Sequence, residues 1–164
     1  MARVALSMFR AKRALPLIPA IAILSLGGGC GGGSEQVSVT QLVQKADAAC
    51  RQERRSFDRI QAHPPPNASV AAAQTGELIT ATEKANSELR DLEPPDQLRG
   101  DYDRYLDARN QVIEEMRRGQ DAAEDQEAGA YGAAQAAVAR DAPQRRKLAR
   151  SLGFKVCSSS PATA

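Results

Sequence analysis

The chain has 164 residues, 42% of them hydrophobic, with 22 basic and 20 acidic residues and a formal net charge of +2. This length suits one domain with a modest core, and a single histidine excludes a histidine-based triad or a metal site with two or three histidines within one chain. Few residues are β-branched and no long stretch alternates with a period of two, which predicts an all-α protein.

Residues 1–29 have the pattern of a lipoprotein-type secretory signal peptide. Four basic residues and no acidic residue precede the apolar run 14–26, which is followed by three glycines. The run is shorter than the roughly 20 apolar residues of a membrane-spanning helix, and it contains two prolines. After removal of this segment 18 basic residues face 20 acidic ones, and the resulting net charge of −2 gives no argument for nucleic-acid binding.

Cys30 lies between two runs of three glycines, directly after the predicted signal. The residues before it resemble a bacterial lipobox, in which the cysteine is acylated and becomes the mature N-terminus, although Gly27 occupies the usual leucine position. We expect lipid on Cys30, a tether over residues 30–37, and attachment to the outer face of the cytoplasmic membrane. Each buried CH₂ of the acyl chains would contribute about 0.8 kcal/mol to anchoring. The alternatives are a secreted protein cleaved elsewhere and an uncleaved anchor, with Cys30 as a spare thiol.

Two helices are predicted in the first half of the remaining chain. Ser38 and Gln41 fit a capping box, and the prolines of "HPPPN" at 63–67 end this first helix near residue 62. The residues on its inward-facing side, called its inner stripe, include Cys50, and either Glu53 or Arg54 occupies the one position of the stripe without an apolar residue. Asn67 can cap a second helix, which ends near residue 92, before "EPPD". The inner stripe predicted for this second helix includes Val70, Ala73, Leu78, Ala85 and Leu89.

Two further helices complete the predicted fold. The third covers about 96–118 with an inner stripe that skips one turn, and "GQDAAEDQEAGA" at 119–130 holds the next turn. The fourth covers about 126–152, where Pro143 should kink or split it, and Gly153 serves as a left-handed cap. The sequence therefore predicts an up-down-up-down four-helix bundle over 38–157, followed by a disordered tail over 158–164.

Cys50 and Cys157 are predicted to form a disulfide. Cys50 lies on the inner stripe of the first helix, and Cys157 follows the fourth helix, whose end should lie near the start of the first. The segment that carries Cys157 must then lie alongside the first helix, because Cys50 is about three turns from the start of that helix. An oxidising compartment and an even number of cysteines after Cys30 favour the bond. The alternative is two buried free thiols.

Three segments follow the glycine-flanked cysteine and carry a resemblance to a known family: "ADAACRQE", "LRDLEPPDQLRGDYDRYL" and a terminal "LARSLGFKVC". This layout resembles small envelope lipoproteins of GC-rich actinobacteria, which are helical and carry two cysteines. The resemblance covers most of the chain after Cys30, but its motifs are structural. It implies an envelope location and a helical fold, and it implies no substrate and no catalytic residue.

Few residues are candidates for chemistry. His63 precedes a proline at a helix end, which is typical of an exposed loop residue. The four acids between 121 and 127 lack the alternating spacing and central glycine of an EF-hand loop, so a solvated turn is favoured over a metal site. Tyr102 and Tyr105 are candidates for lining a ligand groove, although their helical spacing favours core positions with hydroxyls at the rim.

Two functions of different class follow from these observations. The first is a non-catalytic binding or scaffold module without cofactor or metal, held at the membrane through Cys30 and contacting another envelope protein or a ligand. The alternative is a carboxylate-dependent hydrolase of wall glycan, or a small-ligand sensor. A glycosidase needs paired carboxylates in a groove, usually with aromatic platforms for sugar. Because the chain has no tryptophan, the binding module is the favoured hypothesis.

Overall fold

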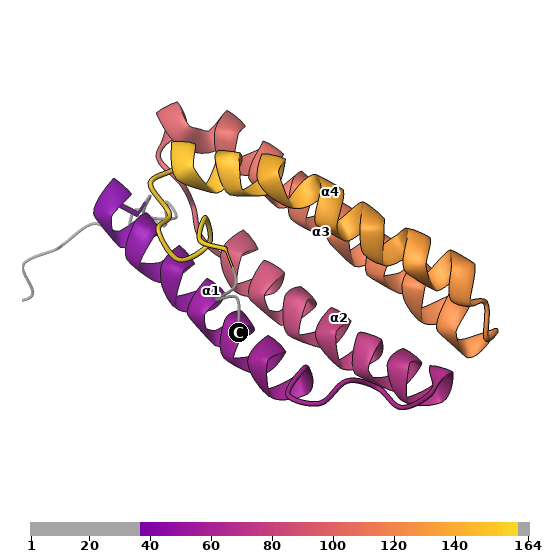
Figure 1. Ribbon diagram of the computed structural model, residues 1–164. Helices are drawn as coiled ribbons and strands as arrows, with labels where there is room; N and C mark the ends of the chain where they lie inside the picture. The colour runs from indigo at the N-terminus through magenta and orange to yellow at the C-terminus, as the bar shows by residue number, and fades with distance from the viewer. Residues whose placement is uncertain (1–36, 161–164) are drawn as a thin grey trace, which may run out of the picture. The chain divides into compact units, whose positions relative to one another are not determined.

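A computed structural model describes residues 37–160. This part of the chain forms four helices and contains no strand, which confirms the predicted all-α class. The predicted signal peptide and Cys30 lie outside the described residues, as does the end of the predicted tail, 161–164. The helices, shown in Figure 1, are α1 (Val39–Ile60), α2 (Ala68–Arg90), α3 (Asp96–Glu124) and α4 (Ala128–Ser151).

Local side-chain capping explains where the first two helices begin. The Ser38 hydroxyl accepts from the Gln41 N–H at 3.2 Å, and the Gln41 side chain accepts from the Ser38 N–H at 2.9 Å. Asn67 Oδ1 accepts from the Val70 N–H at 3.0 Å and starts α2 in the same way. Each cap satisfies N–H groups that have no partner inside the helix. Both predicted helix starts are confirmed.

The turn between α3 and α4 is shorter than predicted. Helix α3 continues to Glu124, and only three residues separate it from α4, including Gln126 with a positive φ of 60°. Gly119, where the turn was expected to begin, is a buried helical residue at the contact of α3 with α4. A Cβ atom there would lie 3.3 Å from the Cβ of Ala134, tighter than ordinary packing. This glycine therefore permits close approach of two helices and does not end one.

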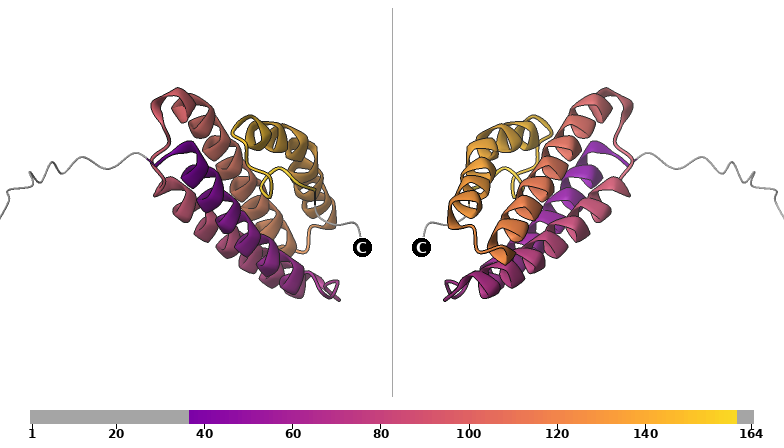
Figure 2. Two further views of the ribbon diagram at one scale, coloured as in Figure 1. Left: turned by 90° about the vertical axis from the view of Figure 1, so that its left-hand side faces the viewer. Right: turned by 90° about the vertical axis from the view of Figure 1, so that its right-hand side faces the viewer.

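Helix α4 passes through Pro143 without a break. Proline removes one helical hydrogen bond and crowds the preceding turn, which bends a helix more often than it ends it inside a packed structure. Figure 2 shows α4 curving along its length. Of the two expected outcomes, a kinked or a split fourth helix, the continuous helix excludes the split.

The inner face of α2 differs from the predicted one. Alanine occurs on several sides of this helix, so the apolar pattern defines its inner face poorly. Packing turns the N-terminal half by about one position, because the buried residues there are Ala71, Ala72, Thr75 and Ile79. The C-terminal half keeps the predicted stripe through Ala85 and Leu89.

The helices pack as sequential neighbours and leave one side of the bundle open. Extensive contacts join α1 to α2, α2 to α3, and α3 to α4, whereas α1 and α4 have no comparable contact. Figures 1 and 2 show α1 and α4 as the two outer helices, with the segment after α4 lying between them. The open side is the feature that distinguishes this arrangement from a closed four-helix bundle.

The largest core cluster lies beside the start of α1. Its centre is aromatic: the Phe154 ring meets the rings of Tyr102 and Tyr105 edge to face, with centroid separations of 6.2 and 5.6 Å. The Tyr102 hydroxyl donates to the Leu89 carbonyl at 2.5 Å, so its polar atom is satisfied inside the core. Both tyrosines occupy the core positions that their helical spacing favoured, but their hydroxyls make buried hydrogen bonds and do not lie at the rim as expected.

Candidate functional site

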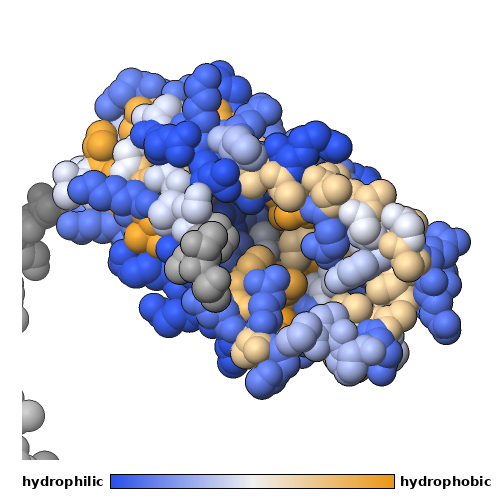
Figure 3. Space-filling view, viewed as in Figure 1, coloured by the Kyte–Doolittle hydropathy of each residue, from blue (hydrophilic) through white to orange (hydrophobic). Residues whose placement is uncertain are grey.

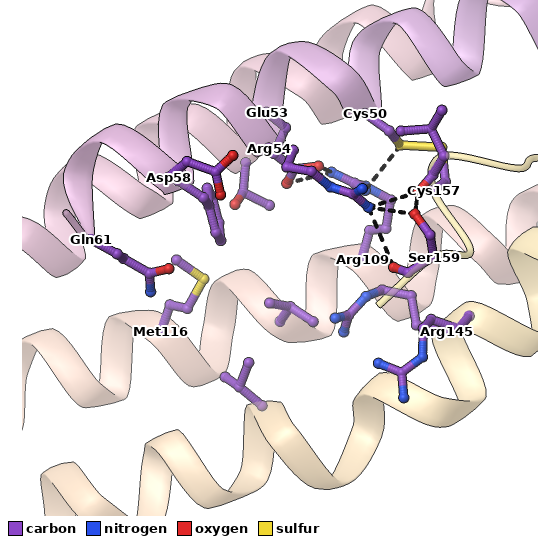
Figure 4. A pocket seen from close by; sticks show the side chains of 16 residues that line it. Cys50, Glu53, Arg54, Asp58, Gln61, Arg109, Met116, Arg145, Cys157 and Ser159 are labelled. Carbon is purple, nitrogen blue, oxygen red and sulfur yellow. Dashed lines mark hydrogen bonds and ion pairs between the residues drawn. A yellow bond between two sulfur atoms is a disulfide. The ribbon is translucent and has the colours of Figure 1, made fainter. Parts of the chain in front are cut away.

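A cleft of about 200 Å³ opens between α1 and α4. Helix α1 forms one wall and α4 the other, α3 supplies most of the floor, and residues 156–159 close one end. Figure 3 shows the hollow on this face, with apolar side chains beside it, and Figure 4 shows its lining. The cleft is the concave feature that the missing contact between α1 and α4 leaves behind, and such sites are where small ligands bind.

The segment that closes the cleft starts from the end of α4. Gly153 has a φ of 81°, and its N–H and that of Phe154 donate to the Arg150 and Ala149 carbonyls at 3.0 and 2.9 Å. This is the hydrogen-bond pattern of a Schellman motif, which confirms the predicted left-handed cap. The turn directs Phe154 into the core and sends the following residues along α1.

Asp47 of α1 holds this segment in place. Its carboxylate accepts from the backbone N–H groups of Lys155, Val156 and Cys157 at 3.1, 2.8 and 3.4 Å. Asp47 is itself buried, and these donors replace the water it gives up. One carboxylate thus sets the path of three consecutive residues beside α1.

The disulfide and Arg54 attach the same segment at two further points. Cys50 and Cys157 are bonded in the structure with their Cα atoms 5.3 Å apart, as the sequence predicted. Arg54 Nη2 donates to the Val156 carbonyl at 3.0 Å and to the Ser159 hydroxyl at 2.6 Å. Ser159 was expected in the disordered tail, and this bond instead places it at the edge of the cleft. The end wall of the cleft is therefore anchored to α1 along its length.

A buried arginine lies in the floor of the cleft. Arg109 Nη2 donates to both oxygens of Glu53 at 2.8 and 2.9 Å, and Nη1 donates to the Tyr105 hydroxyl at 3.3 Å. Its Nε donates to the Asn86 side chain. Burial is the largest single influence and by itself would lower the pKa of Arg109, but the charge of Glu53, the Tyr105 hydroxyl and the hydrogen bonds to both together outweigh it, so the pKa is raised. Arg109 and Glu53 thus form a satisfied ion pair between α3 and α1.

A second arginine at the cleft has no such partner. Arg145 projects from α4 and is half-buried, and its Nη1 is the one buried side-chain nitrogen or oxygen among residues 37–160 without a hydrogen-bond partner. Burial, with the positive charge of Arg109 as the next contribution, lowers the pKa of Arg145. Arg145 and its neighbour Arg146 make no ion pair within the described part of the chain. This wall therefore carries two positive charges that are not in ion pairs with other described residues.

The rest of the cleft is apolar. Val112 and Met116 of α3 are buried in a small cluster against which Phe57 of α1 and Val138 of α4 pack. These four residues line the same cleft as Arg145 and Arg146, so one cleft combines an arginine-rich wall with an apolar region. That combination suits a molecule with an apolar body and a negatively charged end.

The other predicted site residues lie elsewhere. Tyr102 and Tyr105 belong to the aromatic core and are not among the residues that line the cleft. His63 is exposed in the connection between α1 and α2, and the acids of 121–127 lie around the turn between α3 and α4. Across residues 37–160, no group of three His, Cys, Asp or Glu side chains is placed to hold a metal ion. The cleft brings together Cys50 and Cys157 alone among the named candidates.

The sequence carried a partial signal for the buried ion pair. Arg109 occupies the turn that the apolar stripe of α3 skips, and Glu53 occupies the open slot in the stripe of α1. Two opposite charges at inward positions of two helices predict an ion pair only if the two positions face each other. The apolar pattern of each helix does not establish that they do. Asp47 and Arg145 have no comparable signal, because the role of Asp47 depends on which backbone N–H groups after α4 reach it and that of Arg145 depends on how α4 lies relative to α1.

No protein-family model, curated protein or solved structure matches the chain. Within residues 37–160, none of the helices has the length and apolar character needed to cross a membrane.

Proposed function

We propose that the chain is a non-catalytic binding module of the cell envelope, that lipid on Cys30 tethers it to the outer face of the cytoplasmic membrane, and that the cleft between α1 and α4 is its binding site. The observation that carries the proposal is the cleft itself, because it pairs an apolar region with an arginine that lacks a partner. A protein that served only as a spacer would need neither an apolar cleft nor an arginine without a partner.

The chemistry of the lining favours binding over catalysis. Two carboxylates line the cleft, and one of them, Glu53, engages Arg109 with both oxygens. A glycan hydrolase needs two carboxyl groups that can exchange protons with substrate and water. A carboxylate whose two oxygens both accept from a buried arginine is suited to structure and not to proton transfer.

The construction of the end wall supports export. The path of residues 155–159 depends on a disulfide, and disulfides form and persist in oxidising compartments. This agrees with the signal-like pattern of residues 1–29 and with a tether that starts at Cys30.

Blocking the cleft tests where binding occurs. Val138→Trp places a large ring at a cleft-lining position, whereas Ala139→Trp places the same ring at the neighbouring exposed position of α4. In a strain from which the gene has been deleted, we expect Ala139→Trp to restore the phenotype and Val138→Trp to fail. Circular dichroism establishes that both variants are folded. Full restoration by a folded Val138→Trp protein would show that the cleft is not the binding site.

The tether is tested separately. Intact-mass analysis of the membrane fraction should show lipid mass on a chain that begins at Cys30, and Cys30→Ala should release the protein from the membrane. Wild-type protein recovered in the medium without lipid mass would contradict the tether and leave the cleft unaffected.

A further inference from the structure

We infer that the cleft binds a small amphipathic oxyanion, with its alkyl or aryl group against Phe57, Val112, Met116 and Val138 and its carboxylate or phosphate group at Arg145. The inference rests on the proposed function and adds the chemical class of the ligand.

Charge is the first argument. Four arginines and two acids line the cleft, and one arginine and one acid, Arg109 and Glu53, neutralise each other. Arg54 has its Nη2 engaged by the backbone and by Ser159. Arg145 and Arg146 therefore present the positive charge that remains available on the α4 wall. The remaining acid of the lining, Asp58, is exposed on α1, so an anion is the complement of the α4 wall.

Desolvation is the second argument. An arginine nitrogen that is shielded from water and makes no hydrogen bond destabilises the ligand-free protein. The guanidinium group is a planar fork whose geometry matches the two oxygens of a carboxylate or phosphate. A small rotation of this flexible side chain toward an oxyanion in the cleft would satisfy the nitrogen. Figure 4 shows Arg145 extending from α4 toward the space that the ligand would fill.

Size and polarity define the rest of the ligand. An apolar cavity of about 150 Å³ is large enough to hold benzene, so a cleft of about 200 Å³ accommodates an aromatic ring or a short alkyl chain together with its head group. Val112 and Met116 are buried, which gives the apolar group a floor shielded from water. A long acyl chain or a polymer exceeds this volume and would have to extend out of the cleft.

The experiment uses five probes that differ in one property at a time. The protein is the full chain carrying Cys30→Ser, which removes the predicted lipid and with it the need for detergent. Calorimetry should show saturable one-to-one binding of octanoate, octyl phosphate or both, and the tighter of the two identifies the head group. Octanol and octylamine should bind at least about tenfold more weakly, because they offer no oxyanion. Relative to octanoate, the affinity of acetate should be about fourfold lower for each missing methylene group that the cleft would bury.

Matched variants assign the head group to Arg145. Arg145→Gln should weaken binding by at least about tenfold, whereas Lys147→Gln, which removes the same charge from an exposed position of α4, should leave it unchanged. Arg145→Lys keeps the charge without the fork and should give an intermediate affinity. Methyl signals of Val112, Met116 and Val138 in NMR spectra should shift on binding in the wild-type protein.

Three results would overturn the inference. These are octanol or octylamine binding as tightly as the anions, equal effects of Arg145→Gln and Lys147→Gln, or no binding of either anion. If no anion binds while Val138→Trp still abolishes the phenotype, the cleft keeps its function and the ligand belongs to another class. If Val138→Trp restores the phenotype, the proposed function itself fails.

Discussion

Among single residues, Arg109 and Glu53 show how a charged pair can take the place of apolar side chains inside a helical bundle. The Arg109 side chain is 6% exposed and that of Glu53 is 15% exposed. Each would be costly to bury alone, and the pair is accepted because its hydrogen bonds extend to Asn86 and Tyr105. Three helices, α1, α2 and α3, are joined by this one network.

Glu53→Gln should destabilise the protein strongly. The substitution leaves the buried Arg109 charge without its counter-ion, which costs about 3–5 kcal/mol of unfolding free energy. Asp58→Asn is the matched control, because Asp58 also lines the cleft but is exposed, and it should change stability by less than about 0.5 kcal/mol. Urea unfolding followed by circular dichroism measures both. Equal stabilities of the two variants would mean that Arg109 does not depend on Glu53.

At the scale of elements, the C-terminal end of α4 controls the cleft more than any other helix end. Gly153 takes a left-handed conformation, and this reverses the chain so that residues 154–159 return along α1. The end wall of the cleft exists because the helix stops there and turns in that direction.

Gly153→Ala should therefore cost about 1–2 kcal/mol, since a left-handed conformation is unfavourable for a residue with a Cβ atom. The added atom would lie 3.5 Å from Val43, an ordinary contact, so the cost comes from the backbone. Gly132→Ala is the opposite case: Gly132 is an interior residue of α4 with open space around it, and alanine there should stabilise by about 0.5–1 kcal/mol. Thermal unfolding of the two variants should shift in opposite directions, and a shift in the same direction would contradict the strained cap.

At the scale of the whole molecule, the disulfide connects the first helix to the segment that follows the last one. Cys50 and Cys157 are separated by 107 residues in sequence, and the bond closes nearly the whole described chain into one loop. The alanine-rich helices bury little apolar area each, so such a closure has a large share in the stability.

Replacing both cysteines by alanine should lower the unfolding free energy by about 4–5 kcal/mol in the chain-entropy model. The residues of the end wall should also lose protection from amide hydrogen exchange before α2 and α3 do, because Asp47 and Arg54 then hold them alone. Denaturant unfolding and exchange mass spectrometry test the two statements. Unchanged stability after removal of both thiols would rule out a structural disulfide.

Alkaline pH should weaken the whole fold through its two core tyrosines. Burial raises the pKa of Tyr102 and of Tyr105 above the usual value of about 10. The folded state therefore keeps these protons at a pH where the unfolded state releases them. Their contribution to stability is complete below about pH 10 and is lost as the pH rises further, by up to about 1.4 kcal/mol per pH unit for each tyrosine.

The measurement is the unfolding free energy between pH 8 and pH 12. Tyr102→Phe should reduce the alkaline slope by about half, and Tyr105→Phe should do the same. A slope that both variants leave unchanged would show that neither hydroxyl is responsible. The substitutions lose the hydrogen bonds of these hydroxyls, so the slope and not the absolute stability is the quantity to compare.

The sequence by itself determined the number of helices, the starts of α1 and α2, the breaks at the two runs of proline, the left-handed cap at Gly153 and the pairing of Cys50 with Cys157. These features depend on neighbouring residues or on a count of cysteines, and both can be read along the chain. Gly119 was misread as a turn residue because a glycine that ends a helix and one that admits a neighbouring helix look the same in sequence.

Only the tertiary structure decided that α1 and α4 stay apart, that Asp47 holds the segment after α4, and that Arg109 is paired while Arg145 is not. Each of these facts concerns groups that are distant in sequence, and apolar stripes made largely of alanine do not specify which helix faces which. The cleft is a consequence of that packing: it is the space that remains when three helix pairs close and the fourth does not.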